Sequence, residues 1–131
     1  MARIVAIVGK SGVGKTTVRR ELERRLRWTS ITVDHHRTLG AGWVSLLLQL
    51  DTVTWPVLVE TIAFPPGYRD RLARHDSRVL EVVCDEGVRI SRGGLETDTH
   101  FDYPWPEKRV IDTTNPFDYD ELAAWCREGR R

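Results

Sequence analysis

One segment near the start of the chain constrains its fold more than any other. Residues 9–16 read GKSGVGKT and fit the spacing G-x-x-x-x-G-K-[ST]. An apolar run from Ile4 to Val8 precedes the segment, and an amphipathic stretch follows it. Glycines let backbone N–H groups wrap around a phosphate, and a helix that begins there directs its positive end at the same anion. The sequence therefore predicts an α/β domain built around a phosphate-binding loop.

The positions of this loop have separate expected roles. We expect Lys15 to reach the β- and γ-phosphates of a nucleotide and to act in catalysis, and the Thr16 hydroxyl to bind Mg²⁺. Gly12 and Gly14 are expected to adopt backbone conformations that residues with a Cβ resist. The alternative, a glycine-rich turn without a ligand, is disfavoured because every motif position is filled. The nucleotide-binding residues are predicted to be Gly9, Lys10, Ser11, Gly12, Val13, Gly14, Lys15, Thr16 and Thr17.

Length and composition set the remaining limits. The 131 residues suffice for one domain, 1–131, and the content of 40% hydrophobic and 30% charged residues is that of an ordinary globular protein. A formal net charge of +1 gives no general argument for binding a polyanion. No stretch approaches the ~20 apolar residues of a membrane span, so we expect a cytoplasmic protein without a membrane partner. Cys84 and Cys126 lack a paired spacing and are expected to be buried free thiols.

Apolar runs and helical periodicity alternate along the chain. Strands are predicted at residues 3–8, 30–33, 56–62, 78–84 and 109–112, and helices at 15–27, 43–50, 69–74, 85–92 and 118–127. Asp118 is placed to cap the last helix together with Glu121. Residues 96–108 have no clear period and are expected to form an ordered loop or lid. This order predicts a three-layer α/β domain with a mostly parallel five-strand sheet.

The first helix carries many charges besides its apolar face of Val18, Leu22 and Leu26. A basic face suggests nucleic-acid binding, but the interleaved glutamates favour an ordinary solvated surface. The charged positions are Arg19, Arg20, Glu21, Glu23, Arg24, Arg25 and Arg27.

A phosphate loop alone does not choose between hydrolysis, signalling and phosphoryl transfer. A small GTPase needs a D-x-x-G switch and an N-K-x-D motif; the nearest segment, Asn115 to Asp118, lacks the lysine. A motor ATPase needs an apolar run that ends in Asp-Glu, which Val59-Glu60 matches only in part, and a longer chain. Both classes are therefore disfavoured.

Asp34 follows the second predicted strand, where ligands bind in an open α/β sheet, and Arg37 lies three residues later. Here the chain resembles small P-loop kinases that act on nucleosides, sugars and polynucleotides, including gluconate, shikimate, adenylylsulfate and chloramphenicol kinases. The closest pattern is that of the phage polynucleotide 5′-kinase. The resemblance implies a nucleotide-kinase-like P-loop NTPase fold, with Asp34 as general base at the acceptor hydroxyl and Arg37 as an acceptor-binding residue. An Asp that caps a turn, or that holds Mg²⁺ through water, is the alternative.

Further site residues follow the other strands. By resemblance, Arg89 and Arg92 belong to the lid and stabilise charge on the transferred phosphate; exposed surface arginines are the alternative. Arg69 is a weaker substrate-binding candidate, and Glu60 is either near the Mg²⁺ water shell or a structural anchor. The lid is shorter than in these families. Side chains that could line an acceptor cleft are His35, His36, Trp43, Tyr68, His100, Tyr103 and Trp105.

The favoured function is an ATP- and Mg²⁺-dependent kinase. It would transfer the γ-phosphate to a hydroxyl of a small molecule, a nucleoside or a nucleic-acid 5′ end. A nucleoside monophosphate kinase, which needs no general base, is one alternative. A nucleotide-binding regulatory protein without transfer activity is the other.

Overall fold

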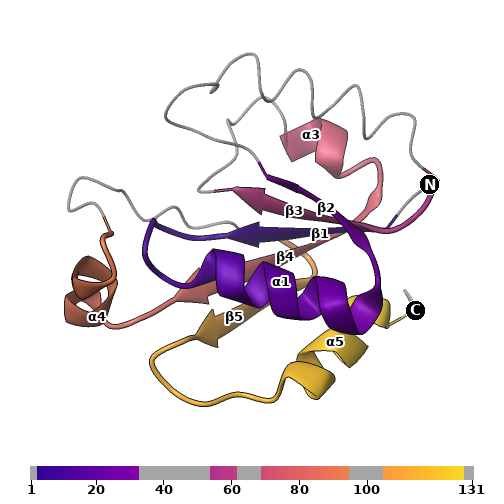
Figure 1. Cartoon of the computed structure of the whole chain (residues 1–131). Coiled ribbons are helices and arrows are strands. Elements are labelled where there is room, and N and C mark those ends of the chain that lie inside the picture. Colours follow the sequence, from indigo (N-terminus) through magenta and orange to yellow (C-terminus); the bar gives the residue numbers. More distant parts are fainter. Residues whose placement is uncertain (1–2, 33–53, 62–68, 95–104, 129–131) are drawn as a thin grey trace.

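A computed structural model describes residues 3–32, 54–61, 69–94 and 105–128. Its centre is a five-stranded sheet of β1 (Arg3–Val8), β2 (Thr29–Thr32), β3 (Val57–Thr61), β4 (Asp76–Val83) and β5 (Lys108–Asp112), in the order β2-β3-β1-β4-β5. Every pairing is parallel. The helices are α1 (Lys15–Leu26), α3 (Arg69–Leu72), α4 (Glu86–Ser91) and α5 (Tyr119–Arg127). Figure 1 shows α1 and α5 on one side of the sheet, α3 on the other, and α4 beyond the end of β4.

The central strands are buried on both faces, which is why they read as continuous apolar runs. On β1, Val5 and Ile7 pack with α1 and α5 in the main core, whereas Ile4, Ala6 and Val8 alternate with them and are also buried. The predicted inner face of α1 is confirmed, since its apolar residues belong to the same core. The core members from the helices are Val18, Leu22, Leu26, Leu122, Ala123 and Cys126.

Arginines fix α5 to the start of the sheet. Arg3 Nη1 donates to the carbonyl oxygens of Cys126 (3.0 Å) and Glu128 (2.6 Å). Arg78 donates from Nη1 to Trp125 O and from Nη2 to Glu128 O, each at 2.6 Å. Carbonyls at the end of a helix have no partner within it, so these guanidinium groups supply the donors that the end of α5 lacks.

The predicted cap of α5 is present. The Asp118 carboxylate accepts hydrogen bonds from the backbone N–H groups of Asp120 (2.8 Å) and Glu121 (3.3 Å). The Glu121 side chain forms an ion pair with Arg109 of β5. The cap therefore works through Asp118, while Glu121 links α5 to the neighbouring strand.

Element boundaries differ from the prediction where pairing or packing overrides the side-chain pattern. β4 begins at Asp76 rather than 78, because Asp76 and Ser77 pair with Arg3 and Ile4. α3 ends at Leu72 rather than 74. β5 begins at Lys108, so the predicted 96–108 loop is one residue shorter at its end. The helix expected at 43–50 lies outside the described residues.

The two cysteines are free. Cys126 is buried as predicted, and burial raises the pKa of its thiol to about 12. Cys84 is only partly buried. Among the described residues, no helix is long and apolar enough to cross a membrane.

Candidate functional site

The phosphate loop lies at the carboxyl ends of the strands, between β1 and α1, where ligands bind in open α/β sheets. Gly12 and Gly14 have φ values of +81° and +100°, which confirms the predicted backbone conformations. A Cβ on Gly12 would lie 2.6 Å from Arg89 O, so both backbone conformation and space require glycine there. Gly14 precedes α1, and its carbonyl accepts the Val18 N–H at 3.1 Å. The first turn of α1 therefore starts directly at the loop.

Lys15 and Thr16, the last motif residues, have defined partners. Lys15 is 8% exposed, and its Nζ donates to Lys10 O at 2.7 Å, across the loop. Thr16 Oγ1 donates to Glu60 Oε2 at 3.1 Å. The ammonium group thus lies within the loop, and the hydroxyl faces a carboxylate on the neighbouring strand.

Glu60 reaches the loop because β3 lies beside β1. It pairs in register with Ile7, near the end of the strand, and is 8% exposed. Its other oxygen, Oε1, accepts a hydrogen bond from Arg19 Nε of α1 at 2.7 Å. A hydroxyl beside a carboxylate is an oxygen donor set of the kind Mg²⁺ prefers, and Mg²⁺ in nucleotide sites takes few protein ligands besides phosphate oxygens. Thr16 and Glu60 therefore fit the predicted metal position.

The short helix α4 packs against the tip of the loop. Arg89 is 1% exposed; its Nη1 donates to Ser11 O at 3.1 Å, and its Nε and Nη2 donate to Glu86 at 2.7 and 2.8 Å. Lys10 Nζ lies 3.4 Å from the same carboxylate. These hydrogen bonds, chiefly that from Arg89, lower the pKa of Glu86 to about 2. The approach is close, since a Cβ on Gly94 would lie 2.5 Å from Ser11 O.

Arg92, the second predicted lid arginine, is exposed. Its Nη1 donates to Thr113 Oγ1 at 3.2 Å and lies 3.7 Å from where a Cβ of Gly14 would stand. Thr113, just after β5, donates in turn to Val13 O. Arg92 is therefore next to the helix N-terminus at which a phosphate is expected, while Arg89 is turned into the protein.

The structure brings together only part of the predicted site. Lys15, Thr16, Glu60, Arg89 and Arg92 meet around the loop, as described above. The backbone of Arg69 begins α3. Asp34 and Arg37, like most of the aromatic and histidine candidates, lie outside the described residues. Trp105 is described, and its Nε1 donates to Ser77 O at 3.1 Å near the start of β4. Trp105 therefore lies at the amino-terminal end of that strand, away from the phosphate loop.

Three contact residues of the site were not predicted: Arg19, Glu86 and Thr113. Glu86 precedes Arg89 by three positions, a helical spacing that could have suggested the ion pair. The bonds of Arg19 to Glu60 and of Thr113 to Val13 join distant parts of the chain and left no local signal.

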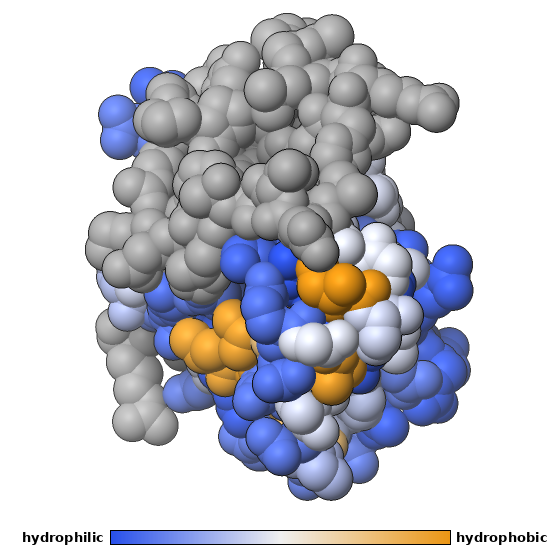
Figure 2. All heavy atoms as spheres, turned by 90° about the vertical axis from the view of Figure 1, so that its left-hand side faces the viewer, coloured by the Kyte–Doolittle hydropathy of each residue, from blue (hydrophilic) through white to orange (hydrophobic). Residues whose placement is uncertain are grey.

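The view toward the carboxyl ends of the strands shows a described surface that is largely hydrophilic, interrupted by separate hydrophobic spots (Figure 2).

Among the described residues, no three His, Cys, Asp or Glu side chains are grouped so that they could hold a metal ion by themselves. A metal here would thus depend on nucleotide oxygens, as Mg²⁺ commonly does.

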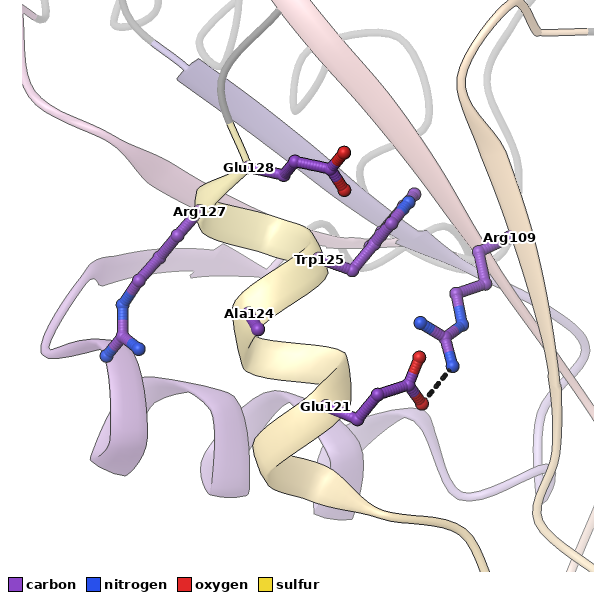
Figure 3. Close-up of a pocket in the computed structure, with 6 residues that line it drawn as sticks. All are labelled: Arg109, Glu121, Ala124, Trp125, Arg127 and Glu128. Atoms are coloured by element: carbon purple, nitrogen blue, oxygen red, sulfur yellow. Dashed lines mark hydrogen bonds and ion pairs between the residues drawn. The ribbon is translucent and has the colours of Figure 1, made fainter.

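A separate hollow of about 590 Å³ lies against α5 (Figure 3). Trp125 and Glu128, which line it, are the residues whose carbonyls are held by Arg78 at the amino-terminal side of the sheet. The dashed contact in Figure 3 is the ion pair of Arg109 with Glu121. The hollow contains no residue of the phosphate loop. Its lining consists of Arg109, Glu121, Ala124, Trp125, Arg127 and Glu128.

No protein-family model matches this chain, and no curated protein sequence matches it either. Solved structures are nevertheless similar to it. A sugar kinase from Janibacter sp. is 17% identical, with a TM-score of 0.66 over 94% of this chain and 91% of the other. A gluconokinase from Sinorhizobium meliloti is also 17% identical, with a TM-score of 0.66 over 93% and 87%. A shikimate kinase from Acinetobacter baumannii in complex with shikimate is 20% identical, with a TM-score of 0.52 over 68% and 60%.

At these identities the similarity establishes the fold. The chain has the α/β fold of the kinase-like P-loop NTPases, with an all-parallel five-strand sheet. The fold class predicted from the sequence is therefore confirmed. The likeness to the phage polynucleotide 5′-kinase stays a prediction, because it depends on Asp34 and Arg37.

Proposed function

We propose that this protein is an ATP- and Mg²⁺-dependent kinase that transfers the γ-phosphate to a hydroxyl group of a small molecule. The observation that carries the proposal is the arrangement of Lys15, Thr16 and Glu60, which places a cation, a hydroxyl and a carboxylate around a glycine loop at the start of α1. Phosphoryl transfer asks a protein mainly to position the phosphate and to balance its charge, and these groups can do both.

Each residue has a defined task on the donor side. The loop N–H groups and Lys15 bind the donor phosphates, so Lys15 must exchange its hydrogen bond to Lys10 O for one to phosphate. Thr16 and Glu60 would hold Mg²⁺, which when bound neutralises charge on the phosphate oxygens. Arg92 lies beside Gly14 and adds positive charge there. Arg89 holds the loop through Ser11 O.

The acceptor side of the proposal depends on the sequence and on the neighbours. The names of the similar structures, sugar kinase, gluconokinase and shikimate kinase, support a small hydroxyl-bearing acceptor. They give no support to a nucleic-acid end as the acceptor. Asp34 as general base, with Arg37 and Arg69 as acceptor-binding residues, completes the proposed site. General-base assistance of this kind contributes ~10²–10⁴-fold to a rate.

A transfer assay tests the proposal. Labelled ATP and Mg²⁺ are incubated with a panel of sugars, sugar acids, shikimate, nucleosides, nucleoside monophosphates and 5′-hydroxyl oligonucleotides. Label on a small-molecule hydroxyl is expected, and Asp34→Asn should lower that turnover while leaving ATP binding intact. Label on a monophosphate or an oligonucleotide would replace the proposed acceptor, and tight ATP binding with no product on any acceptor would favour a regulatory protein.

A further inference from the structure

The charged face of α1 is not uniformly solvated. Arg19 has a side chain only 16% exposed, whereas that of Arg24, on the same helix, is 66% exposed. Arg24 pairs with Glu21 at 3.0 Å, three positions away on the same helix. Arg19 instead reaches across to β3 and β2. The predicted solvated surface is therefore confirmed for Arg24 and wrong for Arg19.

Arg19 uses different nitrogens for different partners. Nε donates to Glu60 Oε1 at 2.7 Å, and Nη1 donates to the Glu23 carboxylate and, at 3.1 Å, to Ser30 Oγ. The planar guanidinium fixes the angle between these bonds, which a lysine ammonium could not do. Burial alone would lower the pKa of Arg19, but the hydrogen bonds to Glu60 and Glu23 outweigh it and the pKa is raised.

This arrangement divides the two oxygens of Glu60 between two tasks. Arg19 occupies Oε1, and Oε2 is turned toward the Thr16 hydroxyl. Glu60 is 8% exposed, and a buried carboxylate needs such partners to satisfy its oxygens and to keep one orientation. Glu23 and Ser30 hold Arg19 on its far side, and Ser30 also donates to Glu23.

We propose that Arg19 is a positioning residue for the metal half of the nucleotide site: it fixes Glu60 so that Oε2 and the Thr16 hydroxyl together accept the Mg²⁺–nucleotide complex. The inference rests on the proposed nucleotide and Mg²⁺ binding and adds a residue that acts only through Glu60. Groups that orient a metal ligand typically change metal affinity by ~10–100-fold when they are removed.

Calorimetric titration with the non-hydrolysable analogue AMP-PNP separates the two contributions. The affinity is measured with EDTA and with Mg²⁺ for the wild type, Arg19→Met, Arg19→Lys and the matched control Arg24→Met. For Arg19→Met we expect the affinity in EDTA to stay close to the wild type and the gain on adding Mg²⁺ to fall by ~10-fold. Arg19→Lys should keep only part of that gain, and Arg24→Met should keep all of it.

A double-substitution cycle with Glu60→Gln separates positioning from general damage. If Arg19 acts through Glu60, adding Arg19→Met to Glu60→Gln changes the Mg²⁺-dependent gain no further, whereas independent effects would multiply. The inference would be overturned if Arg19→Met kept the wild-type gain in AMP-PNP affinity on adding Mg²⁺, or if it lost affinity equally with EDTA and with Mg²⁺. Either result would leave the proposed function in place. Absence of any Mg²⁺-dependent gain in the wild type would instead count against the proposed function itself. Should Arg19→Met fail to fold, Arg19→Lys decides by the same criteria.

Discussion

Both ends of the parallel sheet are held by buried or half-buried arginines, but their acceptors differ. At the amino-terminal end, Arg3 and Arg78 bind carbonyl oxygens where α5 ends. At the carboxyl-terminal end, Arg89 binds a carbonyl of the phosphate loop, and Arg19 binds the Glu60 carboxylate. The first pair closes a helix end onto the sheet; the second pair holds groups that we propose bind the nucleotide.

The comparison shows that burial of an arginine does not by itself indicate a functional site. Arg78 is 3% exposed and Arg89 is 1% exposed, yet only Arg89 contacts the phosphate loop. What distinguishes them is the acceptor. Substitutions at the two ends should therefore separate stability from nucleotide binding.

Lys15→Ala should give the largest functional effect. Its ammonium group is the only lysine Nζ that the structure places inside the loop among the residues it describes. Loss of one donor that stabilises developing charge typically costs ~10²–10³-fold in turnover, and ATP binding should weaken as well. Titration with ATP and the transfer assay check this, with Arg24→Met as control. Wild-type binding and turnover in Lys15→Ala would show that the loop does not hold the donor.

Arg78→Met should give the largest loss of stability without a loss of nucleotide affinity. It removes the donor to Trp125 O and one of the two donors to Glu128 O, which keeps Arg3, and it removes the stacking of the guanidinium on the Trp125 ring, 5.4 Å from its centroid. We expect the free energy of unfolding to fall by about 3 kcal/mol. Urea unfolding measures it, and Arg24→Met should stay within about 0.5 kcal/mol of the wild type.

A nucleotide affinity that fell together with stability in Arg78→Met would break the proposed separation of the two ends. For that reason the titration is made without urea, at a temperature at which the wild type and Arg78→Met are both folded.

Much of the fold was predictable from the sequence, because β1, β3 and β4 are buried on both faces and so read as apolar runs. The start of β4 was not predictable. Asp76 and Ser77 are polar, and they belong to the strand because Arg3 and Ile4 of β1 pair with them. A backbone ladder is decided by the neighbouring strand, which local sequence does not identify.

The site divides in the same way. The loop and the helix after it follow from spacing, so Gly12, Gly14 and Lys15 were found. The buried state of Arg89 depends on Ser11, 78 positions earlier, and that of Arg19 on Glu60, 41 positions later. From sequence alone, charges of both signs on a helix predict a solvent-exposed face. Only the position of the neighbouring strands shows which of these side chains are buried.

Arg89→Met should affect both properties, each less than the preceding variants do. The substitution removes the donor to Ser11 O and leaves Glu86 with the weaker Lys10 contact at 3.4 Å. We expect a stability loss of about 2 kcal/mol and a nucleotide affinity between those of the wild type and Lys15→Ala. Unfolding and titration measure the two. Arg89→Lys keeps the charge without the planar fork and should recover little of either; full recovery would argue against a positioning role for the guanidinium.

Glu86→Gln should give the smallest effect, and one that depends on pH. Arg89 holds the pKa of Glu86 at about 2, below the usual 4.5, so the ionised form is favoured in the folded protein. A lowered pKa stabilises the fold above the unfolded value and loses that contribution as the pH falls toward the folded value. The difference in unfolding free energy between wild type and Glu86→Gln should therefore be constant above about pH 5 and shrink between 4.5 and 2.

Glu121→Gln is the matched control for this prediction. Glu86 and Glu121 are 60% and 59% exposed, and each has its pKa lowered first by a hydrogen bond from an arginine, Arg89 or Arg109. Both variants should be less stable than the wild type at neutral pH, by a difference that shrinks as the pH falls, because solvent-exposed pairs of this kind behave alike. Only Glu86→Gln should also weaken nucleotide binding at neutral pH, since only Glu86 holds the arginine that contacts Ser11 O. Equal nucleotide affinities in the two variants would mean that the loop keeps its shape without the Glu86–Arg89 pair. The arginines at the two ends of the sheet would then differ less in their effect on nucleotide binding than their acceptors suggest.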